Sequence, residues 1–280
     1  MQVTYSGKDK DPGWGEPPPW RTPEFWDRRA SSFAEHDQGS GYADAFMKII
    51  AMEPDWTVLD VGSATGTLAL PLAGNAKSIT ALDFSSKMLE VLRQRCDEAD
   101  IHNISTVHGR WEDDWDRLGI TPHDVAIASR SMPLGSARAA IAKLNEYTRK
   151  RVYVVVAAGN GPRDRRVYEA IGREFTPPPH YGEINLMLAQ QGLSAGNAFI
   201  SYQDTSSYGT HAEAFEFLKR SLPEISPQEE EMLQDFLRKS LVLKGGRWSL
   251  YPVREIRWAV IWWDKEMEKE LVMSSITAEI

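Results

Sequence analysis

The feature that most restricts the fold of this chain is the alternation of short apolar runs with helical stretches between residues 57 and 159. Runs of strand length such as TVLDVG, SITALDF and DVAIAS are each followed by a segment whose apolar residues recur at helical spacing. RVYVVVAAG is apolar almost throughout, as expected for a strand buried on both faces of a parallel sheet. The alternation predicts an α/β fold with a doubly wound, Rossmann-like sheet.

The order of elements changes after residue 159. Two helices are predicted at about 208–244, between the strands predicted in NAFISYQD and REIRWAVIWWD. Ser226, followed three residues later by Glu229, matches the capping box that begins many helices. We interpret residues 206–250, approximately, as a helical insertion of the kind that can cap a site.

The ends of the chain differ from the middle. Residues 1 to about 21 are rich in Gly, Pro and Trp, which predicts irregular structure, and a helix should follow from Thr22 or Pro23. We interpret 1–38 as an irregular segment with a lid helix, with a plain packing helix as the alternative. The main domain is then 39–265, and 266–280 form a C-terminal tail.

Composition excludes several classes of protein. The net charge of −8 argues against a nucleic-acid partner, which usually requires a basic face. A single cysteine, Cys96, cannot form an internal disulfide or a cysteine-based zinc site, and the six histidines lack metal-binding spacing, so no metal is expected. The N-terminus has no signal-peptide pattern and no run of 18 apolar residues occurs, so we expect a cytoplasmic protein with no membrane span.

The segment VLDVGSATGTL reads as a buried strand that runs into a tight glycine turn. The dinucleotide fingerprint G-x-G-x-x-G is absent, because position 64 is alanine. Asp60 would repel a pyrophosphate but suits an ammonium or other hydrogen-bond donors. Asp83 ends the next strand and should reach the same crevice, where a carboxylate can accept both ribose hydroxyls. The two acids predict a ligand that has a ribose and a donor-rich arm.

On these residues the chain resembles the class I S-adenosylmethionine-dependent methyltransferases, small-molecule branch. Asp60-Val61-Gly62-Ser63-Ala64-Thr65-Gly66 matches the family motif D/E-x-G-x-G-x-G except at Ala64, and Asp83-Phe84-Ser85-Ser86-Lys87-Met88-Leu89 resembles its D-x-S-x-x-M-L run. The resemblance implies S-adenosylmethionine as cofactor and a mostly parallel sheet with an antiparallel last strand. Residues 109–112 replace the family's G-D-A-E, so Trp111 is expected to stack on the adenine.

The resemblance also implies a set of cofactor-binding residues. They are Asp60, Gly62, Ser63, Ala64, Thr65, Gly66, Asp83, Phe84, Met88, Arg110, Trp111, Glu112 and Ser129. Asp60 would hold the amino-acid arm of the cofactor and Asp83 its ribose. For Trp111 and Glu112 the alternative is a surface loop.

Other residues are candidates for the acceptor side. Arg130 and Arg163 follow the fourth and fifth predicted strands and are candidates for binding an anionic substrate, with solvated charges or structural ion pairs as the alternative. His36, His180 and Tyr181 are weak candidates for a general base. The function predicted is methyl transfer from S-adenosylmethionine to a small molecule. A non-catalytic sensor or inactive partner subunit, or an NAD-dependent oxidoreductase, are the alternatives.

Overall fold

A computed structural model describes residues 22–38, 41–178, 180–222 and 224–265. The chain divides into two compact units. The described residues of the first lie in 22–156, 181–200 and 259–265, and those of the second in 157–180 and 201–258. Residues 206–250, predicted as an insertion, lie within the second unit.

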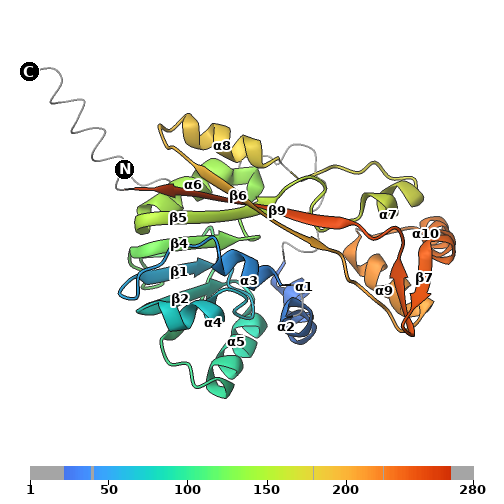
Figure 1. The fold of residues 1–280 in the computed structure, drawn as a ribbon, viewed down its shortest axis with the longest axis horizontal. Helices are drawn as coiled ribbons and strands as arrows, with labels where there is room; N and C mark the ends of the chain where they lie inside the picture. The colour runs from blue at the N-terminus through green and yellow to red at the C-terminus, as the bar shows by residue number, and fades with distance from the viewer. Residues whose placement is uncertain (1–21, 39–40, 179, 223, 266–280) are drawn as a thin grey trace, which may run out of the picture. The chain divides into compact units, whose positions relative to one another are not determined.

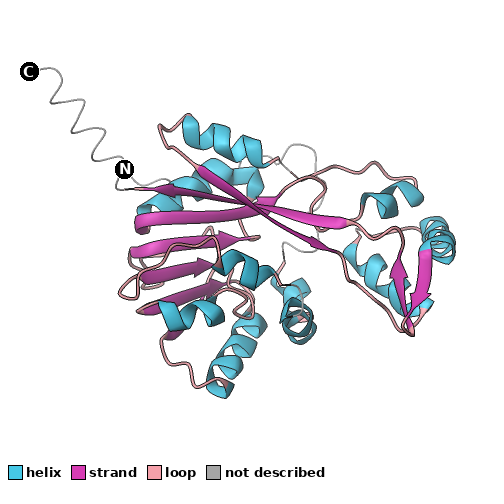
Figure 2. Cartoon of the chain, viewed as in Figure 1, coloured by secondary structure: helices cyan, strands magenta, loops and turns pink. Residues whose placement is uncertain are grey.

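The strands of the described residues form two sheets, which Figures 1 and 2 show as arrows. They are β1 (Thr57–Val61), β2 (Ser78–Asp83), β3 (Ile104–His108), β4 (His123–Ser129), β5 (Thr148–Ala157), β6 (Gly196–Gln203), β7 (Leu241–Lys244), β8 (Arg247–Leu250) and β9 (Glu255–Asp264). The larger sheet has the order β3-β2-β1-β4-β5-β9-β6, and the other pairs β7 with β8.

Ten α-helices complete the described chain. They are α1 (Pro23–Asp27), α2 (Ala30–Gln38), α3 (Tyr42–Met47), α4 (Ala69–Leu72), α5 (Ser86–Glu98), α6 (Ala137–Glu146), α7 (Arg165–Ala170), α8 (Tyr181–Ala189), α9 (His211–Ser221) and α10 (Pro227–Ser240).

The large sheet confirms the predicted α/β class. Strands β1 to β5 pair in parallel, with Asp60 beside Ala81 of β2 and Ile127 of β4. The last strand, β9, runs antiparallel to β5. Its direction follows from two backbone hydrogen bonds, from Ala158 N–H to the Arg257 carbonyl (2.9 Å) and from Lys265 N–H to the Lys150 carbonyl (2.7 Å). The predicted antiparallel last strand is therefore confirmed.

The apolar pattern of α5 explains how it packs. Leu89, Leu92 and Cys96 lie on one face and form a buried cluster with Ala81 of β2. Ser85 begins the helix, and its side chain accepts a hydrogen bond from Met88 N–H (3.1 Å). This helix start follows directly on Asp83, so the cap and the carboxylate belong to one turn of chain.

The second unit shows one confirmed prediction and one correction. The capping box of Ser226 and Glu229 is present at the start of α10. The helix ends at Ser240, however, and the predicted continuation through residues 241–244 is wrong, because Leu241–Lys244 form β7. Gly245 and Gly246 both have positive φ (59° and 78°) and turn the chain into β8, which is the two-residue hairpin signal.

The predicted N-terminal helix is broken, because it is divided at Arg28 and Arg29 into α1 and α2. In the second unit, α7 spans only Arg165–Ala170. Gly172 follows it with φ at 74°, a conformation that ends helices.

Candidate functional site

The glycine turn after β1 bends through three residues with positive φ: Gly62 (74°), Ala64 (48°) and Gly66 (86°). A Cβ added to Gly62 would lie 2.3 Å from Cβ of Ser131, and one added to Gly66 would lie 2.4 Å from Cδ1 of Leu92. Gly62 is therefore required both by backbone conformation and by the nearby Ser131, whereas Gly66 is favoured mainly by its positive φ, because the end of the Leu92 side chain can shift. Alanine at 64 occupies a conformation that glycine adopts more easily.

Asp83 lies at the end of β2, next to this turn. Its Oδ2 accepts a hydrogen bond from Ala64 N–H (2.8 Å), and its Oδ1 accepts one from Ser85 N–H (2.9 Å). Burial raises the pKa of Asp83, while these backbone donors act in the opposite direction. The carboxylate is thus fixed between the glycine turn and the start of α5.

Asp60, in β1, is the other acid next to the glycine turn, and it is almost fully buried. Burial first, and then the nearby Asp83 carboxylate, raise the pKa of Asp60 to about 7. Among the described residues, its Oδ2 has no hydrogen-bond partner, and neither do Oγ of Ser63 or Oγ1 of Thr67. Unpartnered buried polar atoms are unfavourable, so this cluster fits a ligand that brings its own donors.

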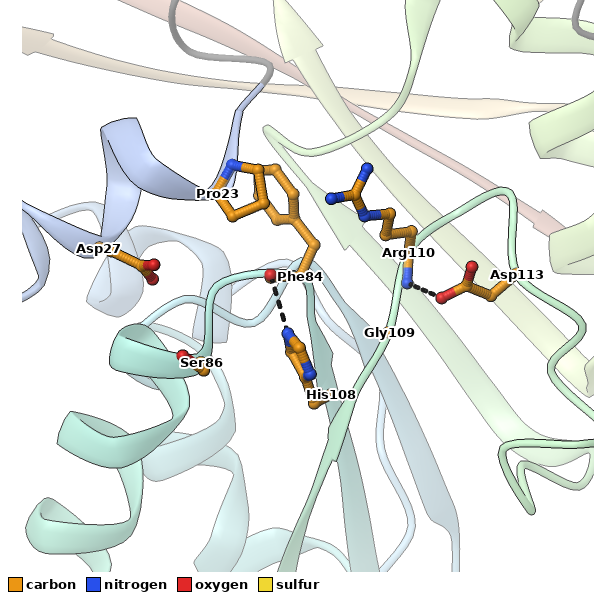
Figure 3. A pocket seen from close by; sticks show the side chains of 8 residues that line it. All are labelled: Pro23, Asp27, Phe84, Ser86, His108, Gly109, Arg110 and Asp113. Carbon is orange, nitrogen blue, oxygen red and sulfur yellow. Dashed lines mark hydrogen bonds between the residues drawn. The ribbon is translucent and has the colours of Figure 1, made fainter.

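A pocket of about 230 Å³ is lined in part by Phe84, the residue that follows Asp83 (Figure 3). Pro23 and Asp27 of α1 lie on one side of it, and Arg110 and Asp113 lie on the other. Phe84, Ser86, His108 and Gly109 complete the lining. His108 Nε2 lies 3.1 Å from the carbonyl oxygen of Phe84, and Arg110 N–H donates to Oδ2 of Asp113 (2.8 Å).

Trp111 and Glu112 do not line this pocket. The Trp111 indole N–H donates to the carbonyl of Ser131 (3.0 Å), and its ring contacts that of Trp115 with the centroids 5.7 Å apart. Glu112 is exposed. Stacking of Trp111 on an adenine, as expected from sequence, stays a prediction.

The loop after β4 lies against the glycine turn. The Ser129 hydroxyl is 2.6 Å from that of Tyr42, and the Arg130 guanidinium lies 4.1 Å from the centre of the Tyr42 ring. Ser131 Oγ donates to the carbonyl of Val61. Ser131 was not among the predicted site residues. Nothing in the sequence marks it, because the contact joins β1 to a loop 70 residues further along the chain.

The remaining candidates are not brought together by the described structure. Tyr181 begins α8 and its ring contacts Phe199, with centroids 5.2 Å apart. Arg163 lies in the second unit, where its guanidinium donates to the Thr176 carbonyl (3.0 Å), and His180 is an exposed residue of that unit. The side chain of His36 lies outside the described part of the structure, and Met88 is buried in α5.

The described residues contain neither a cluster of metal ligands nor a membrane-spanning helix. No group of three or more His, Cys, Asp or Glu side chains is arranged to hold a metal ion within residues 22–38, 41–178, 180–222 and 224–265. Over the same ranges no helix is long and apolar enough to cross a membrane.

Comparison with known proteins places this site in a family. Residues 58–150 match the model of a methyltransferase domain. An uncharacterised protein of Haemophilus influenzae is 33% identical over 248 residues, covering 86% of this chain and 89% of its own. A demethylmenaquinone methyltransferase of Listeria welshimeri is 38% identical over 66 residues, which are 22% of this chain and 28% of that protein.

A solved structure agrees with the family match. A protein assigned to the methyltransferases, from Bacillus halodurans C-125, superposes with a TM-score of 0.54 at 15% identity, covering 80% of this chain and 99% of its own. The fold, the acid–glycine turn and the matching domain define a class I methyltransferase. The chain belongs to the class I S-adenosylmethionine-dependent methyltransferases, whose cofactor is S-adenosylmethionine.

Proposed function

We propose that this protein transfers a methyl group from S-adenosylmethionine to a small molecule. The observation that carries the proposal is the buried Asp60, whose Oδ2 has no partner among the described residues and whose carboxylate lies close enough to Asp83 to interact with its charge. An ammonium group supplies the donors and the positive charge that such a carboxylate lacks. A pyrophosphate would instead place negative charge against two acids.

Each part of the crevice suits one part of the cofactor. Asp60, with Ser63 Oγ, holds the amino-acid arm, and Asp83 accepts the ribose hydroxyls. The pocket between Phe84 and Arg110 takes the adenine. The cofactor supplies a methyl group on a sulfonium, which is an activated leaving group. The chain's own contribution is to position the acceptor and exclude water, so proximity and orientation account for much of the rate.

The acceptor proposed is a small molecule, and an anionic one. The acidic net charge of −8 disfavours a nucleic-acid acceptor. This chain also resembles, over 66 residues, a Listeria protein whose name, demethylmenaquinone methyltransferase, gives a small molecule as the acceptor. Arg130 is the group we propose for a carboxylate or phosphate of the acceptor, and a role for Arg163, which belongs to the other unit, stays a separate prediction. If the acceptor must lose a proton, Tyr181, His180 and His36 remain the candidates.

Titration calorimetry tests the cofactor. We expect S-adenosylmethionine and S-adenosylhomocysteine to bind, and NAD not to bind. Asp60→Asn and Asp83→Asn should each lower the affinity for S-adenosylhomocysteine at least tenfold. Asp44→Asn changes an exposed acid of α3 and should leave this affinity unchanged. Binding of NAD alone would overturn the proposal.

Catalysis needs a second experiment, because the alternative of a non-catalytic sensor also binds the cofactor. Alanine at position 64, where φ is 48°, is the departure from the family motif that favours this alternative. We expect a panel of carboxylates, phosphates and phenols to yield a methylated product detectable by mass spectrometry. Tight cofactor binding with no product from the whole panel would favour the sensor. Arg130→Ala and Arg163→Ala should each weaken the binding of an anionic acceptor without changing the affinity for the cofactor.

A further inference from the structure

We propose that Asp27 is a positioning residue, which latches α1 onto the start of α5 and so slows release of the cofactor's adenosine. The inference rests on the proposed function. The sequence gives no role to Asp27, and no residue of α1 belongs to the family motifs found in it. The structure places the Asp27 carboxylate on the pocket wall and, through Ser85, in contact with Asp83.

The latch consists of two hydrogen bonds to one carboxylate oxygen. Asp27 Oδ1 accepts from the Ser85 hydroxyl (2.6 Å) and from Lys87 N–H (3.3 Å). Lys87 is in the first turn of α5, where backbone N–H groups have no partner inside the helix. The carboxylate therefore completes the capping of α5 from a separate helix, at the end where a negative charge is favoured.

Ser85 connects Asp27 with the residues proposed to bind the cofactor. It is fully buried, and its hydroxyl also accepts from Met88 N–H (3.1 Å) while its own N–H donates to Asp83 Oδ1 (2.9 Å). Asp83 in turn accepts from Ala64 N–H (2.8 Å). One continuous set of hydrogen bonds thus runs from α1 to the proposed ribose carboxylate and the glycine turn.

The position of α1 gives the latch its effect on the ligand. Pro23 and Asp27 form the side of the pocket opposite Arg110 (Figure 3). Phe25 of this helix is buried, and Thr22 caps the helix by accepting a hydrogen bond from Phe25 N–H (3.4 Å). An adenosine in the pocket can leave more readily if this wall moves away. Loss of the Asp27 bonds should therefore speed its release.

The test compares release of S-adenosylhomocysteine and of 5′-methylthioadenosine, which lacks the amino-acid arm. Asp27→Ala should release both ligands roughly tenfold faster, since it loses a hydrogen bond to a charged group. Asp27→Asn keeps an acceptor oxygen for Ser85 and Lys87, so its release rates should be close to those of the wild type. Glu24→Ala is the matched control, because Glu24 is an exposed acid of the same helix that does not line the pocket.

Limited trypsin digestion gives a readout that needs no ligand. Arg28 and Arg29 follow α1 directly, and we expect cleavage there to be faster in Asp27→Ala than in the wild type or Glu24→Ala, as followed by mass spectrometry. Circular dichroism should show that the variants are folded. Asp60→Asn should weaken the binding of S-adenosylhomocysteine but not that of 5′-methylthioadenosine. This comparison distinguishes contacts with the amino-acid arm from contacts with the adenosine.

Two results would overturn the inference, and they differ. Equal release of both ligands from the wild type and Asp27→Ala would remove the latch while leaving the cofactor proposal intact. Failure of the wild type to bind either ligand would overturn the proposed function and the latch with it.

Discussion

The backbone N–H of Ala64 donates a hydrogen bond of 2.8 Å to Oδ2 of Asp83, from a residue whose φ is 48°. The left-handed backbone at 64 points its amide at the carboxylate. A side chain in this conformation carries a strain of about 1 kcal/mol. The departure from the family's glycine thus leaves the hydrogen bond intact and adds local strain.

Replacement of Ala64 measures that strain. Ala64→Gly relieves it but gives the unfolded chain more freedom, so we expect the free energy of unfolding to change by no more than about 1 kcal/mol, with S-adenosylhomocysteine affinity retained. Ala64→Val should lower the free energy of unfolding by about 1–3 kcal/mol, because β-branched residues tolerate positive φ poorly. Chemical denaturation checks both values. An Ala64→Val protein as stable as the wild type would contradict the strained turn.

Substitution of Gly62 can distinguish the cost of a positive φ from the cost of a steric clash with Ser131. Gly62→Ala places a Cβ 2.3 Å from Cβ of Ser131 at a φ of 74°. Gly119 has nearly the same φ (75°) with no atom within 4 Å of an added Cβ, so Gly119→Ala reports the backbone strain alone. We expect Gly62→Ala to be less stable than Gly119→Ala by at least about 2 kcal/mol.

The collision also predicts a partial rescue. Ser131→Gly removes the Cβ that an alanine at 62 would meet, so the double variant should regain part of the stability lost by Gly62→Ala. Denaturation of the single and double variants gives the coupling between the two sites. If Gly62→Ala and Gly119→Ala lower the free energy of unfolding equally, Ser131 can move away from the added Cβ without loss of stability.

The buried Asp60 should make stability depend on pH. Its pKa is about 7 in the folded protein, against an ordinary value of 3.8. The folded state therefore binds this proton more tightly, so the associated stability is present below about pH 4 and is lost as the pH rises towards 7. Asp60→Asn cannot ionise. Its free energy of unfolding relative to the wild type should rise by roughly a few kcal/mol between pH 4 and 8.

Urea denaturation of both proteins at several pH values gives this difference directly, and other titrating groups largely cancel in it. A difference that does not change with pH would mean that folding does not raise the pKa of Asp60. The same ionisation should act on the ligand. Since an ammonium prefers the carboxylate form, affinity of the wild type for S-adenosylhomocysteine should rise up to about pH 7, and Asp60→Asn should lack this dependence.

The capping box of α10 predicts a local effect in the second unit. Glu229 N–H donates to Ser226 Oγ (3.3 Å), and Ser226 N–H donates to a Glu229 carboxylate oxygen (2.7 Å). Ser226→Ala should lower the free energy of unfolding by about 1 kcal/mol. Ser226→Asp keeps an acceptor at the cap and should lose much less. Thermal unfolding followed by circular dichroism distinguishes the two variants.

Local sequence patterns predicted the strands and the glycine turn well. The α/β class follows from the alternation of apolar runs and helical periodicity, and it is confirmed. Asp60 and Asp83 were predicted to share a crevice because parallel strands present their carboxyl ends at one edge of a sheet. The register of β1 against β2 places Asp60 beside Ala81, two residues before Asp83, as that argument requires.

What sequence reasoning missed depends on contacts between distant segments. The bond between Asp27 and Ser85 and that between Ser131 and Val61 join residues 58 and 70 positions apart, and neither has a local signature. The β7–β8 hairpin was missed for a different reason. Gly245-Gly246 between two short runs is a recognised turn signal, but the helical pattern of the preceding segment was extended over residues 241–244, up to the glycines.

The place of β9 has a consequence for the order in which the sheet can assemble. β9 is the last strand in the sequence, yet it lies between β5 and β6. β6 therefore finds its neighbour only after residues 204–254 have intervened, and most of those residues belong to the second unit. Pairings across such long separations are slow to form. The sheet should gain its final edge late, and a chain interrupted before residue 255 would leave the sides of both β5 and β6 that face β9 without a partner.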